Sequence, residues 1–455
     1  MRGALNRIVH HPLVFGLTCV LFSVGIGLLG YRVQQSDFVL LVAIYTPTFL
    51  LYLLLCQAAV SIQRRYFLFG LAVIARLLLL PSLPGWSDDL YRFIWDGRLI
   101  VHGTNPFEQL PSYYMEPGHR VSGLEESLYA SLNSADYFTV YPPVAQGIFA
   151  LAAWLSPQSI LGSALVIRGF LLLCELGTIW LLLRLLRNMQ MPEHKAIWYA
   201  LNPLVILEVV GNLHFEGAMI FFLLLSFYFL QKQQLIPSAF GMALSIASKL
   251  VPLIFLVFWL RRLGWKSAFW FFGVLGFSLL LVFSPLLSGA FFQGMGSSLG
   301  LYFHQFEFNA SLYYLARYIG YQLEGYNMID TLGPLLALTT FVGVLSMALV
   351  WKTSGDQAFM KKHLFAICLY VMCSTTVHPW YAILPFTLSL FSSYRFPMLF
   401  TYFVVWSYAH YAQNRFEENI LLIALEYSII IGVGIGECWY LKKVVRTSPD
   451  KVRRT

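Results

Sequence analysis

Residues 86–107 read WSDDLYRFIWDGRLIVHGTNPF and form a cluster of charges in a chain that is otherwise largely a string of apolar segments. When this stretch is plotted on a helix at about 100° per residue, its apolar and its charged side chains occupy opposite arcs. The sequence therefore predicts an amphipathic helix that rests its apolar side on membrane or protein and turns its carboxylates toward a polar partner. The charged arc consists of Asp88, Asp89, Arg92 and Asp96, and Arg98 is a further charge in the same stretch.

The ends of this helix are predicted by the residues that flank it. Ser87 is a suitable N-cap, and the acids that follow lie in the first turn, where the helix dipole favours negative charge. Gly97, Gly103 and the pair Asn105-Pro106 favour loop structure, so the helix is expected to break from Gly97 onward.

The composition is that of a membrane protein. Hydrophobic residues make up 58% of the chain, charged residues make up 11%, and the mean hydropathy is +0.68. Since a soluble domain carries roughly 25% charged residues, we expect an all-α polytopic membrane protein in contact with lipid. The net charge of +8 comes from basic residues in short loops, where they orient membrane insertion, so no nucleic-acid partner is expected.

Apolar runs that approach the length a bilayer requires, roughly 20 residues, mark the expected spans. Several runs are shorter and are expected to form kinked or broken helices around Pro252 and Pro379, sheltered by neighbouring helices. The expected bundle has about 12–14 transmembrane helices and forms one domain over residues 1–455. The candidate spans are 13–31, 38–58, 67–81, 159–184, 196–212, 217–231, 235–249, 250–260, 267–287, 331–351, 363–377, 381–393, 396–411 and 419–441.

The basic residues predict the orientation of these spans. Most of the 30 Lys and Arg residues fall on one side if the amino terminus is cytoplasmic. By the positive-inside rule both termini are then cytoplasmic, and residues 81–158 and 288–330 form two extracytoplasmic loops. The first loop carries the acidic stretch, and the second carries aromatic residues that include Tyr302, Phe306 and Phe308.

One apolar segment tests this orientation. Residues 144–155 follow a Tyr-Pro-Pro motif at 141–143 and are too few to cross a bilayer alone. If they crossed, Arg184 and Arg187 would become extracytoplasmic. The segment is therefore expected to be a juxtamembrane helix that lies in the outer leaflet.

Charged residues inside the apolar segments are candidates for function, because a charge in hydrocarbon is unfavourable. They could equally pair between helices or extend their side chains to the membrane surface. These residues are Arg76, Arg168, Glu175, Glu208 and Glu426.

The predicted topology places a second set of polar and aromatic residues on the same membrane face as Asp88. Such a convergence is what a site for a polar headgroup requires. His214 and Glu216 could be a pair of metal ligands, but two residues at this spacing are a weak signal. Lys249 could bind phosphate or join an interhelical ion pair. Two further aromatics could be an interfacial belt or a sugar platform. The set comprises His214, Glu216, Lys249, His378, Trp380 and Tyr381.

Together these motifs resemble the GT-C superfamily of integral-membrane glycosyltransferases, which carry an acidic pair in the first large outer loop. The order and sidedness of WSDDLYRFIWDGR, GTNPF, LNPLVI, ASKLVPLIF and HPWY are similar to those of bacterial polyprenol-phosphate-mannose-dependent mannosyltransferases. The resemblance covers about residues 67–440. Residues 13–58 are expected to be an N-terminal addition, because the superfamily core usually has one span before the acidic loop.

The resemblance implies an inverting transferase that moves a sugar, expected to be mannose, from a polyprenyl-phosphate carrier to a lipid- or glycan-linked acceptor. A carboxylate takes the proton from the acceptor hydroxyl, and cations neutralise the departing phosphate. Asp88 matches the first acid of the motif and is the expected base, with Asp89 as the second catalytic carboxylate. Lys249 is expected to bind the phosphate. The other expected substrate-binding residues are Arg92, Asp96, Arg98, Tyr141, His214, Glu216, His378, Trp380 and Tyr381.

The resemblance also implies that no cofactor is required, although the residues leave a divalent cation open. The expected location is the bacterial cytoplasmic (inner) membrane. An ion- or proton-coupled transporter is the alternative from another class, because it would also place ionisable residues in a helix bundle. It would bury them near the membrane midplane and often show inverted repeats, and no repeat is visible in the sequence.

Overall fold

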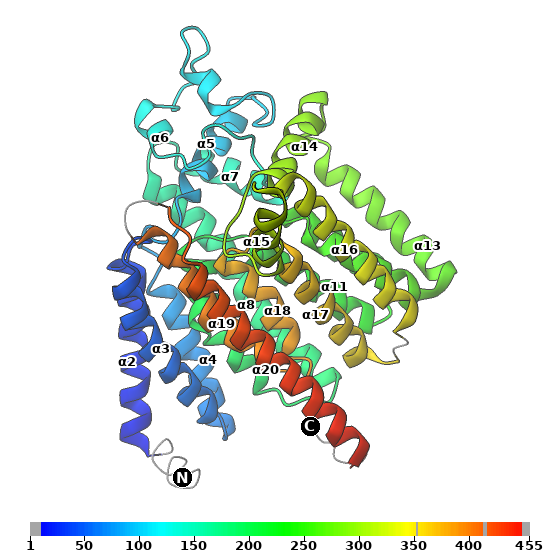
Figure 1. The fold of residues 1–455 in the computed structure, drawn as a ribbon. Coiled ribbons are helices and arrows are strands. Elements are labelled where there is room, and N and C mark those ends of the chain that lie inside the picture. Colours follow the sequence, from blue (N-terminus) through cyan, green and yellow to red (C-terminus); the bar gives the residue numbers. More distant parts are fainter. Residues whose placement is uncertain (1–10, 352–353, 413–415, 448–455) are drawn as a thin grey trace.

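Helices make up the regular structure of this protein. The computed structural model describes residues 11–351, 354–412 and 416–447. Within these residues the only β-type pairing is an isolated parallel bridge between Phe308 and Thr376, so the expected all-α fold is confirmed. The helices form a bundle with a smaller helical cap at one end, drawn at the top of Figure 1.

Three helices precede the cap, and the first two form a hairpin at the edge of the bundle (Figure 1). The hairpin is fastened to the C-terminal part of the chain, where the Tyr45 hydroxyl donates to the carbonyl oxygen of Thr401 at 2.7 Å. The third helix begins at Ile62, earlier than predicted, because the Ser61 hydroxyl accepts a hydrogen bond from the Arg64 backbone at 3.3 Å. The helices are α2 (Pro12–Tyr31), α3 (Phe38–Gln57) and α4 (Ile62–Leu77).

The cap is built on α5 and α7, which pack against each other. Gly97 permits this approach, because a β-carbon there would lie 2.2 Å from the carbonyl oxygen of Phe149. The prediction that Gly97 breaks the helix is therefore wrong, since α5 continues to Val101 and the glycine serves packing. The predicted juxtamembrane helix is α7, which is too short to span a bilayer alone. The cap elements are α5 (Asp89–Val101), η1 (Pro111–Met115), α6 (Glu126–Ala130) and α7 (Pro143–Leu155).

The middle of the chain contains a sharply bent helix pair. The segments Pro203–Gly211 and Glu216–Gln231 meet at 109°, and a π-helical turn lies directly before the bend. Irregular backbone at membrane depth is tolerated only where protein or a cavity surrounds it, and α8 and α12 pack against this pair. The elements of this part are α8 (Ile160–Asn188), α9 (Lys195–Ala200), α10 (Pro203–Val205), η2 (Ile206–Gly211), α11 (Glu216–Gln231), α12 (Leu235–Ser248) and η3 (Val251–Phe255).

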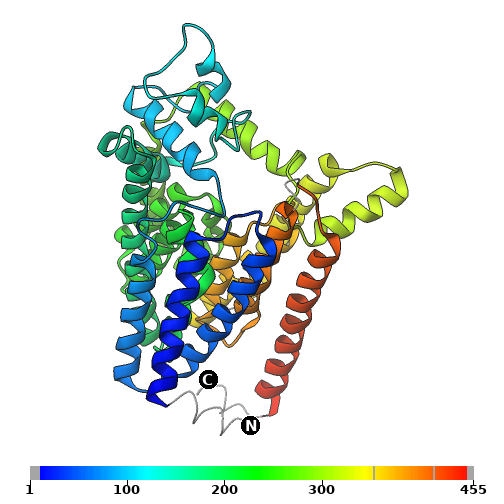
Figure 2. The same cartoon turned by 90° about the vertical axis from the view of Figure 1, so that its left-hand side faces the viewer.

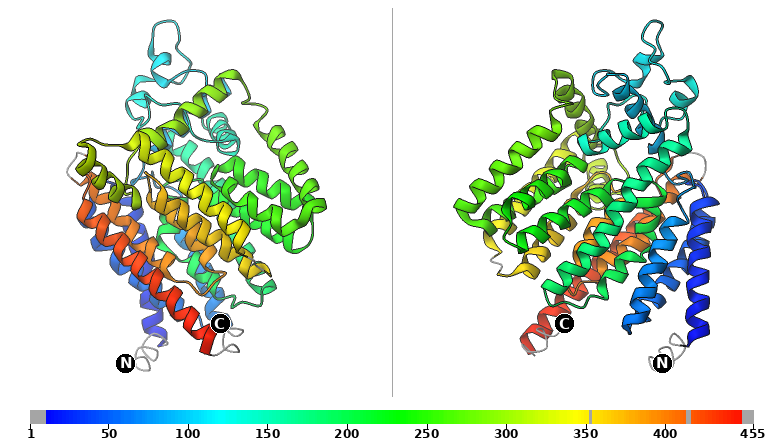
Figure 3. Two further views of the ribbon diagram at one scale, coloured as in Figure 1. Left: turned by 45° about the vertical axis from the view of Figure 1, so that its right-hand side comes forward. Right: turned by 180° about the vertical axis from the view of Figure 1, so that it is seen from behind.

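The second half of the chain completes the bundle. α13 lies at the edge opposite α2 (Figure 3). It bends at Gly264, whose φ of 70° is not helical, and this bend falls between the spans predicted at 250–260 and 267–287. The predicted second outer loop is mostly helical, and its α15 projects from the side of the bundle (Figure 2). The elements are α13 (Leu256–Phe283), α14 (Gly289–His304), α15 (Leu312–Glu324), α16 (Ile329–Val350), α17 (Asp356–Cys373), η4 (Pro379–Ala382), α18 (Ile383–Ser389), α19 (Phe396–Phe403), η5 (Val404–Tyr411) and α20 (Ile420–Thr447).

Six helices of the described chain are long and apolar enough to cross a membrane, and seven if the bent pair counts as one span. The protein is therefore a polytopic membrane protein, with fewer full-length spans than the about 12–14 expected from apolar runs. The difference arises because several runs form helices shorter than a bilayer. Examples are α12 and α18, whose residues are largely buried.

The two ends of the described chain lie at the same end of the bundle. α2 begins and α20 ends at the end of the bundle opposite the cap (Figure 2). This arrangement agrees with the predicted sidedness. Residues 1–10 and 448–455 lie outside the described residues, so the cytoplasmic placement of the termini stays a prediction.

Candidate functional site

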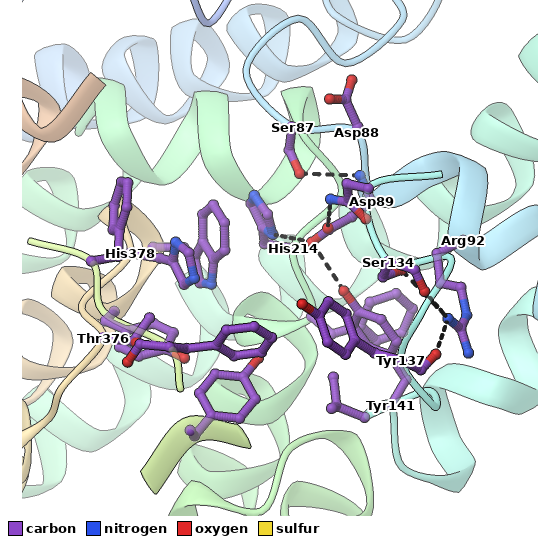
Figure 4. A pocket seen from close by; sticks show the side chains of 18 of the residues that line it. Ser87, Asp88, Asp89, Arg92, Ser134, Tyr137, Tyr141, His214, Thr376 and His378 are labelled. Carbon is purple, nitrogen blue, oxygen red and sulfur yellow. Dashed lines mark hydrogen bonds and ion pairs between the residues drawn. The ribbon is translucent and has the colours of Figure 1, made fainter. Parts of the chain in front are cut away.

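A cavity of about 440 Å³ lies between the cap and the bundle (Figure 4). Its walls come from turns that are far apart in the sequence, including the start of α5, the bend before α11 and the end of α12. All the predicted site residues line it except Asp96 and Arg98. The topology argument therefore brought together residues that do meet in space.

The start of the acidic stretch is anchored to the bundle. The backbone N–H of Trp86 donates to Oδ1 of Asn212, in the bend before α11, at 3.2 Å. The Ser87 hydroxyl accepts from the N–H of Asp89 at 3.3 Å. The prediction that Ser87 is the N-cap is wrong by one position, because α5 begins at Asp89 and Asp88 occupies the N-cap.

Asp89 is held by its neighbours inside the cavity. Its Oδ1 accepts a hydrogen bond from the Asn133 amide at 3.0 Å, and its Oδ2 accepts one from the Tyr141 hydroxyl at 2.9 Å. The Nδ1 of His214 lies 4.0 Å from the same Oδ2 (Figure 4). Burial, and then the charge of Asp89, raise the pKa of Tyr141 well above 10.0, so the phenol stays protonated and keeps donating. Asp89 is thus fixed in place with both oxygens engaged.

Asp88 has different surroundings. Its side chain is exposed and turned away from Asp89 and His214 (Figure 4), and no described residue donates a hydrogen bond to its carboxylate. Partial desolvation, and then repulsion by the charge of Asp89, raise the pKa of Asp88 above 3.8. A carboxylate with a raised pKa is a better proton acceptor near neutral pH.

A row of stacked rings forms one wall of the cavity. The His214 and Trp380 rings lie 3.5 Å apart, Trp380 and His378 lie 4.6 Å apart, and His378 and Phe308 lie 4.9 Å apart. Desolvation lowers the pKa of His378 well below 6.5, so His378 is neutral at pH 7. It therefore offers a ligand a ring and a polar nitrogen, and no positive charge.

Lys249 and Glu216 form an ion pair in the cavity wall. Lys249 directly follows α12, and its Nζ lies 5.3 Å from the centre of the Tyr381 ring. The lysine side chain is 27% exposed and the glutamate side chain 4% exposed, so the cation is the member that faces the open space. Lys249 can therefore hold its ion pair with Glu216 and still reach a phosphate in the cavity, so its two predicted roles do not exclude each other.

The structure separates the two residues of the predicted metal pair. Glu216 faces Lys249, whereas His214 lies near Asp89 and has its Nε2 3.2 Å from Oε2 of Glu208. Across the described parts of the chain, no group of three or more His, Cys, Asp or Glu residues is placed to hold a metal ion.

The remaining charges of α5 support the cap. Arg92 donates to Oδ1 of Asp96 at 2.8 Å and to the carbonyl oxygens of Ser134 and Tyr137 at 2.9 and 2.8 Å. Arg98 donates to the carbonyl oxygen of Gly123. All three charged side chains are buried. These three charges therefore bind other parts of the cap. Asp96 and Arg98 do not line the cavity, and their role in substrate binding stays a prediction.

Several lining residues were not predicted. The segment predicted as the second outer loop supplies Tyr302, Glu307 and Phe308 to the wall. Gln35, before α3, and Asn133, in the cap, carry no motif that could have indicated them. Only the folding of distant turns onto one cavity identifies such residues.

The fold and the cavity define a polytopic membrane protein with a polar site at one end of its helix bundle. Residues 25–263 match the family described as alpha-(1->6)-mannopyranosyltransferase, N-terminal domain. Because this range is more than half of the chain, the protein belongs to that family, and the resemblance to GT-C mannosyltransferases is confirmed.

A relative also carries this name. Alpha-(1->6)-mannopyranosyltransferase B of Corynebacterium glutamicum is 27% identical over 168 residues, which are 37% of this chain. The match spans 27% of the relative's length. The family match begins within α2 and contains α3, so most of the helix hairpin expected as an N-terminal addition lies inside it.

Proposed function

We propose that this protein transfers a mannosyl group from a polyprenyl-phosphate carrier to a hydroxyl of a lipid- or glycan-linked acceptor, at the extracytoplasmic face of the cytoplasmic membrane. One observation supports this most strongly. A carboxylate that accepts no hydrogen bond from the described residues, a lysine and a wall of aromatic rings share one cavity. Membership in the alpha-(1->6)-mannopyranosyltransferase family supports mannose as the sugar.

The reaction requires a base for the acceptor hydroxyl and a cation that neutralises the leaving phosphate. The acceptor oxygen bonds to the anomeric carbon from the face opposite the phosphate, and its proton passes to Asp88. The bond between that carbon and the phosphate oxygen breaks, and its electron pair leaves with polyprenyl phosphate. Because this leaving group is an anion, it needs a nearby cation and no added proton, which is the role we assign to Lys249.

The partners of these two residues fit the same scheme. Asp89, held by Asn133 and Tyr141, orients the substrate beside the base. Oε2 of Glu216 is buried without a hydrogen-bond partner among the described residues, so it can accept a hydrogen bond from a sugar hydroxyl. Through its other oxygen Glu216 positions Lys249.

The aromatic wall supplies contact area. Stacked side chains such as His214 and Trp380 present flat apolar faces with polar edges, which suit the apolar face and the hydroxyls of a pyranose. No resident cofactor is part of this scheme, and addition of EDTA to the assay tests whether a divalent cation contributes.

The test is transfer by purified protein from a synthetic polyprenyl-phosphate mannose to an octyl α-mannoside. We expect release of polyprenyl phosphate together with a mannosylated product, and the matching glucosyl donor serves as the control for sugar identity. Binding of donor without release, together with ion-driven flux into proteoliposomes, would favour the transporter instead.

A further inference from the structure

A second hollow, of about 320 Å³, lies beside the first. It is lined by Gln34, Gln35 and Ser36 from the turn between α2 and α3, by Asp88, and by the rings of Tyr411 and Phe416. Gln34, Ser36 and Phe416 are exposed, so the hollow is open to the surroundings of the protein.

The two spaces meet at the proposed catalytic carboxylate. Gln35, Asp88, Tyr411 and Phe416 line both of them, whereas Lys249 lines only the first. Asp88 thus stands at a boundary, with the cation of the site on one side. In Figure 4 its carboxylate points away from the residues that surround Asp89.

The chemistry of the second hollow differs from that of the first. Among the described residues, its lining contains no Lys or Arg, whereas Lys249 and Arg92 line the first cavity. Its walls combine amide and hydroxyl groups, which donate and accept hydrogen bonds, with two aromatic rings. This combination recognises a neutral carbohydrate.

The hollow is held in place by backbone contacts between its two sides. The N–H of Gln35 donates to the carbonyl oxygen of Gly85 at 2.8 Å. The N–H of Gln34 donates to Oδ2 of Asp37 at 3.0 Å. A β-carbon at residue 85 would lie 2.8 Å from the carbonyl oxygen of Val33, so glycine is needed for this approach. The turn before α3 is therefore docked beside the acidic stretch.

We propose that this second hollow is the acceptor site, that it binds a neutral mannoside, and that the turn at Gln34–Ser36 positions the attacking hydroxyl at Asp88. The inference rests on the proposed function and adds to it the place and chemical class of the acceptor. Inversion requires acceptor and phosphate on opposite faces of the anomeric carbon. Separate spaces on either side of Asp88 meet that requirement, with the bonds and the proton moving as described above.

The experiment compares Ser36→Trp, which fills the hollow, with Val39→Trp. Val39 lines neither space and is 80% exposed, so it receives the same bulk three positions away. With octyl α-mannoside as acceptor, Ser36→Trp should raise the acceptor KM by about tenfold or more while donor affinity changes little, because only one substrate loses contacts. An acceptor KM equal to that of Val39→Trp overturns the inference.

A second measurement does not depend on the folding of a tryptophan variant. A diazirine-bearing octyl mannoside should label wild-type protein within residues 31–37, and excess octyl α-mannoside should suppress the labelling. Labelling confined to other peptides overturns the inference. If the wild type releases no polyprenyl phosphate, the proposed function itself fails. Transfer by an active wild type combined with an unaffected Ser36→Trp defeats only the acceptor site.

Discussion

Two groups of buried charges in this protein lie in different surroundings. One, which we call the closed network, joins Arg76 of α4 to Glu175 of α8 and Tyr199 of α9. The other, the cavity group, comprises Asp89, His214, Glu216 and Lys249. The sequence made the two groups candidates on different grounds. Arg76 and Glu175 carry charges inside apolar segments, whereas the cavity residues were predicted to converge on one membrane face.

The charged groups of the closed network are paired with one another and with backbone carbonyl oxygens. The Arg76 guanidinium donates to Glu175 at 2.7 Å and to the carbonyl oxygens of Ala200 and Ala72 at 2.7 and 3.0 Å. The Tyr199 hydroxyl donates to the other oxygen of Glu175 at 2.5 Å. Every side chain of the network is fully buried, and none of them lines either cavity. Such a network fixes the packing of three helices.

The cavity group retains unused capacity. One oxygen of Glu216 has no hydrogen-bond partner within the described residues, and the exposed part of the Lys249 side chain faces the cavity. The comparison shows that a buried charge becomes a functional candidate when spare hydrogen-bonding capacity adjoins a space that a ligand can fill. Burial of a charge alone indicates only that it must have a partner.

The first prediction concerns the side of the membrane on which the cavity opens, and its outcome is either one side or the other. If the cavity opens at the extracytoplasmic face, reporter fusions after Leu110 and after Thr455 should give opposite signals, because the positive-inside rule puts the carboxyl terminus in the cytoplasm. Dual phosphatase and fluorescence reporters measure this. The same signal from both fusions would contradict the predicted topology, and the cavity would then not be assigned to the face where a lipid-linked sugar is presented.

Asp88→Asn should produce the largest graded effect. The amide keeps the shape of the side chain but cannot take a proton, and positioned general bases contribute about 10²–10⁴-fold in rate. Turnover should therefore fall by about that factor while donor binding is kept. Asp89→Asn is the matched control and should lose less, because Asp89 orients the substrate. Full activity in Asp88→Asn together with an inactive Asp89→Asn would exchange the two roles.

Arg76→Leu should act on stability. It leaves the Glu175 carboxylate buried without its partner, and breaking a buried pair in this way lowers the free energy of unfolding by about 3–5 kcal/mol. Denaturant unfolding in detergent measures the loss. The double variant Arg76→Leu/Glu175→Leu should recover most of it, because replacing both charges by apolar groups is close to neutral. If folded Arg76→Leu protein lost mannosyl transfer, the closed network would have a role in function as well as in stability.

Lys249→Met should weaken donor binding by about tenfold, because the variant removes the charge that faces the phosphate. Lys249→Arg should bind better than Lys249→Met, since it keeps the charge. Titration with polyprenyl-phosphate mannose measures the affinity. The pair Lys249→Met/Glu216→Gln controls for the glutamate left unpaired in the single variant. Equal donor affinity in the wild type and Lys249→Met would make the Lys249–Glu216 pair a structural one.

The pH dependence should be the smallest of these effects. Since Asp88 must be deprotonated to act as base, kcat/KM falls as pH drops through its raised pKa. The acidic limb of the profile should therefore lie above the ordinary value of 3.8. Removing the charge of its neighbour in Asp89→Asn should move that limb to lower pH. A limb that stays in place in Asp89→Asn would mean that the two carboxylates do not interact.

Much of the site could be predicted from sequence because its residues fall where apolar runs end. Lys249 follows such a run directly, and His378 precedes a Pro-Trp-Tyr motif, so the topology alone assigned both to one face. Helical periodicity shows which residues share an arc but not what covers that arc, so it could not predict the partners of Asp96 and Arg98. Asp96 accepts hydrogen bonds from Arg92 and Gln146, and Arg98 donates to the carbonyl oxygen of Gly123.

The sequence by itself determined that this chain is an all-helical membrane protein, since nearly continuous apolar segments leave few other ways to satisfy backbone hydrogen bonds in lipid. It also predicted that the acidic pair lies in an outer loop. Only the tertiary structure decided that Asp89 is held by Asn133 and Tyr141, while no residue in the described part of the chain donates to Asp88. These contacts join residues more than 40 positions apart, and no local pattern records which distant loop will close over a side chain.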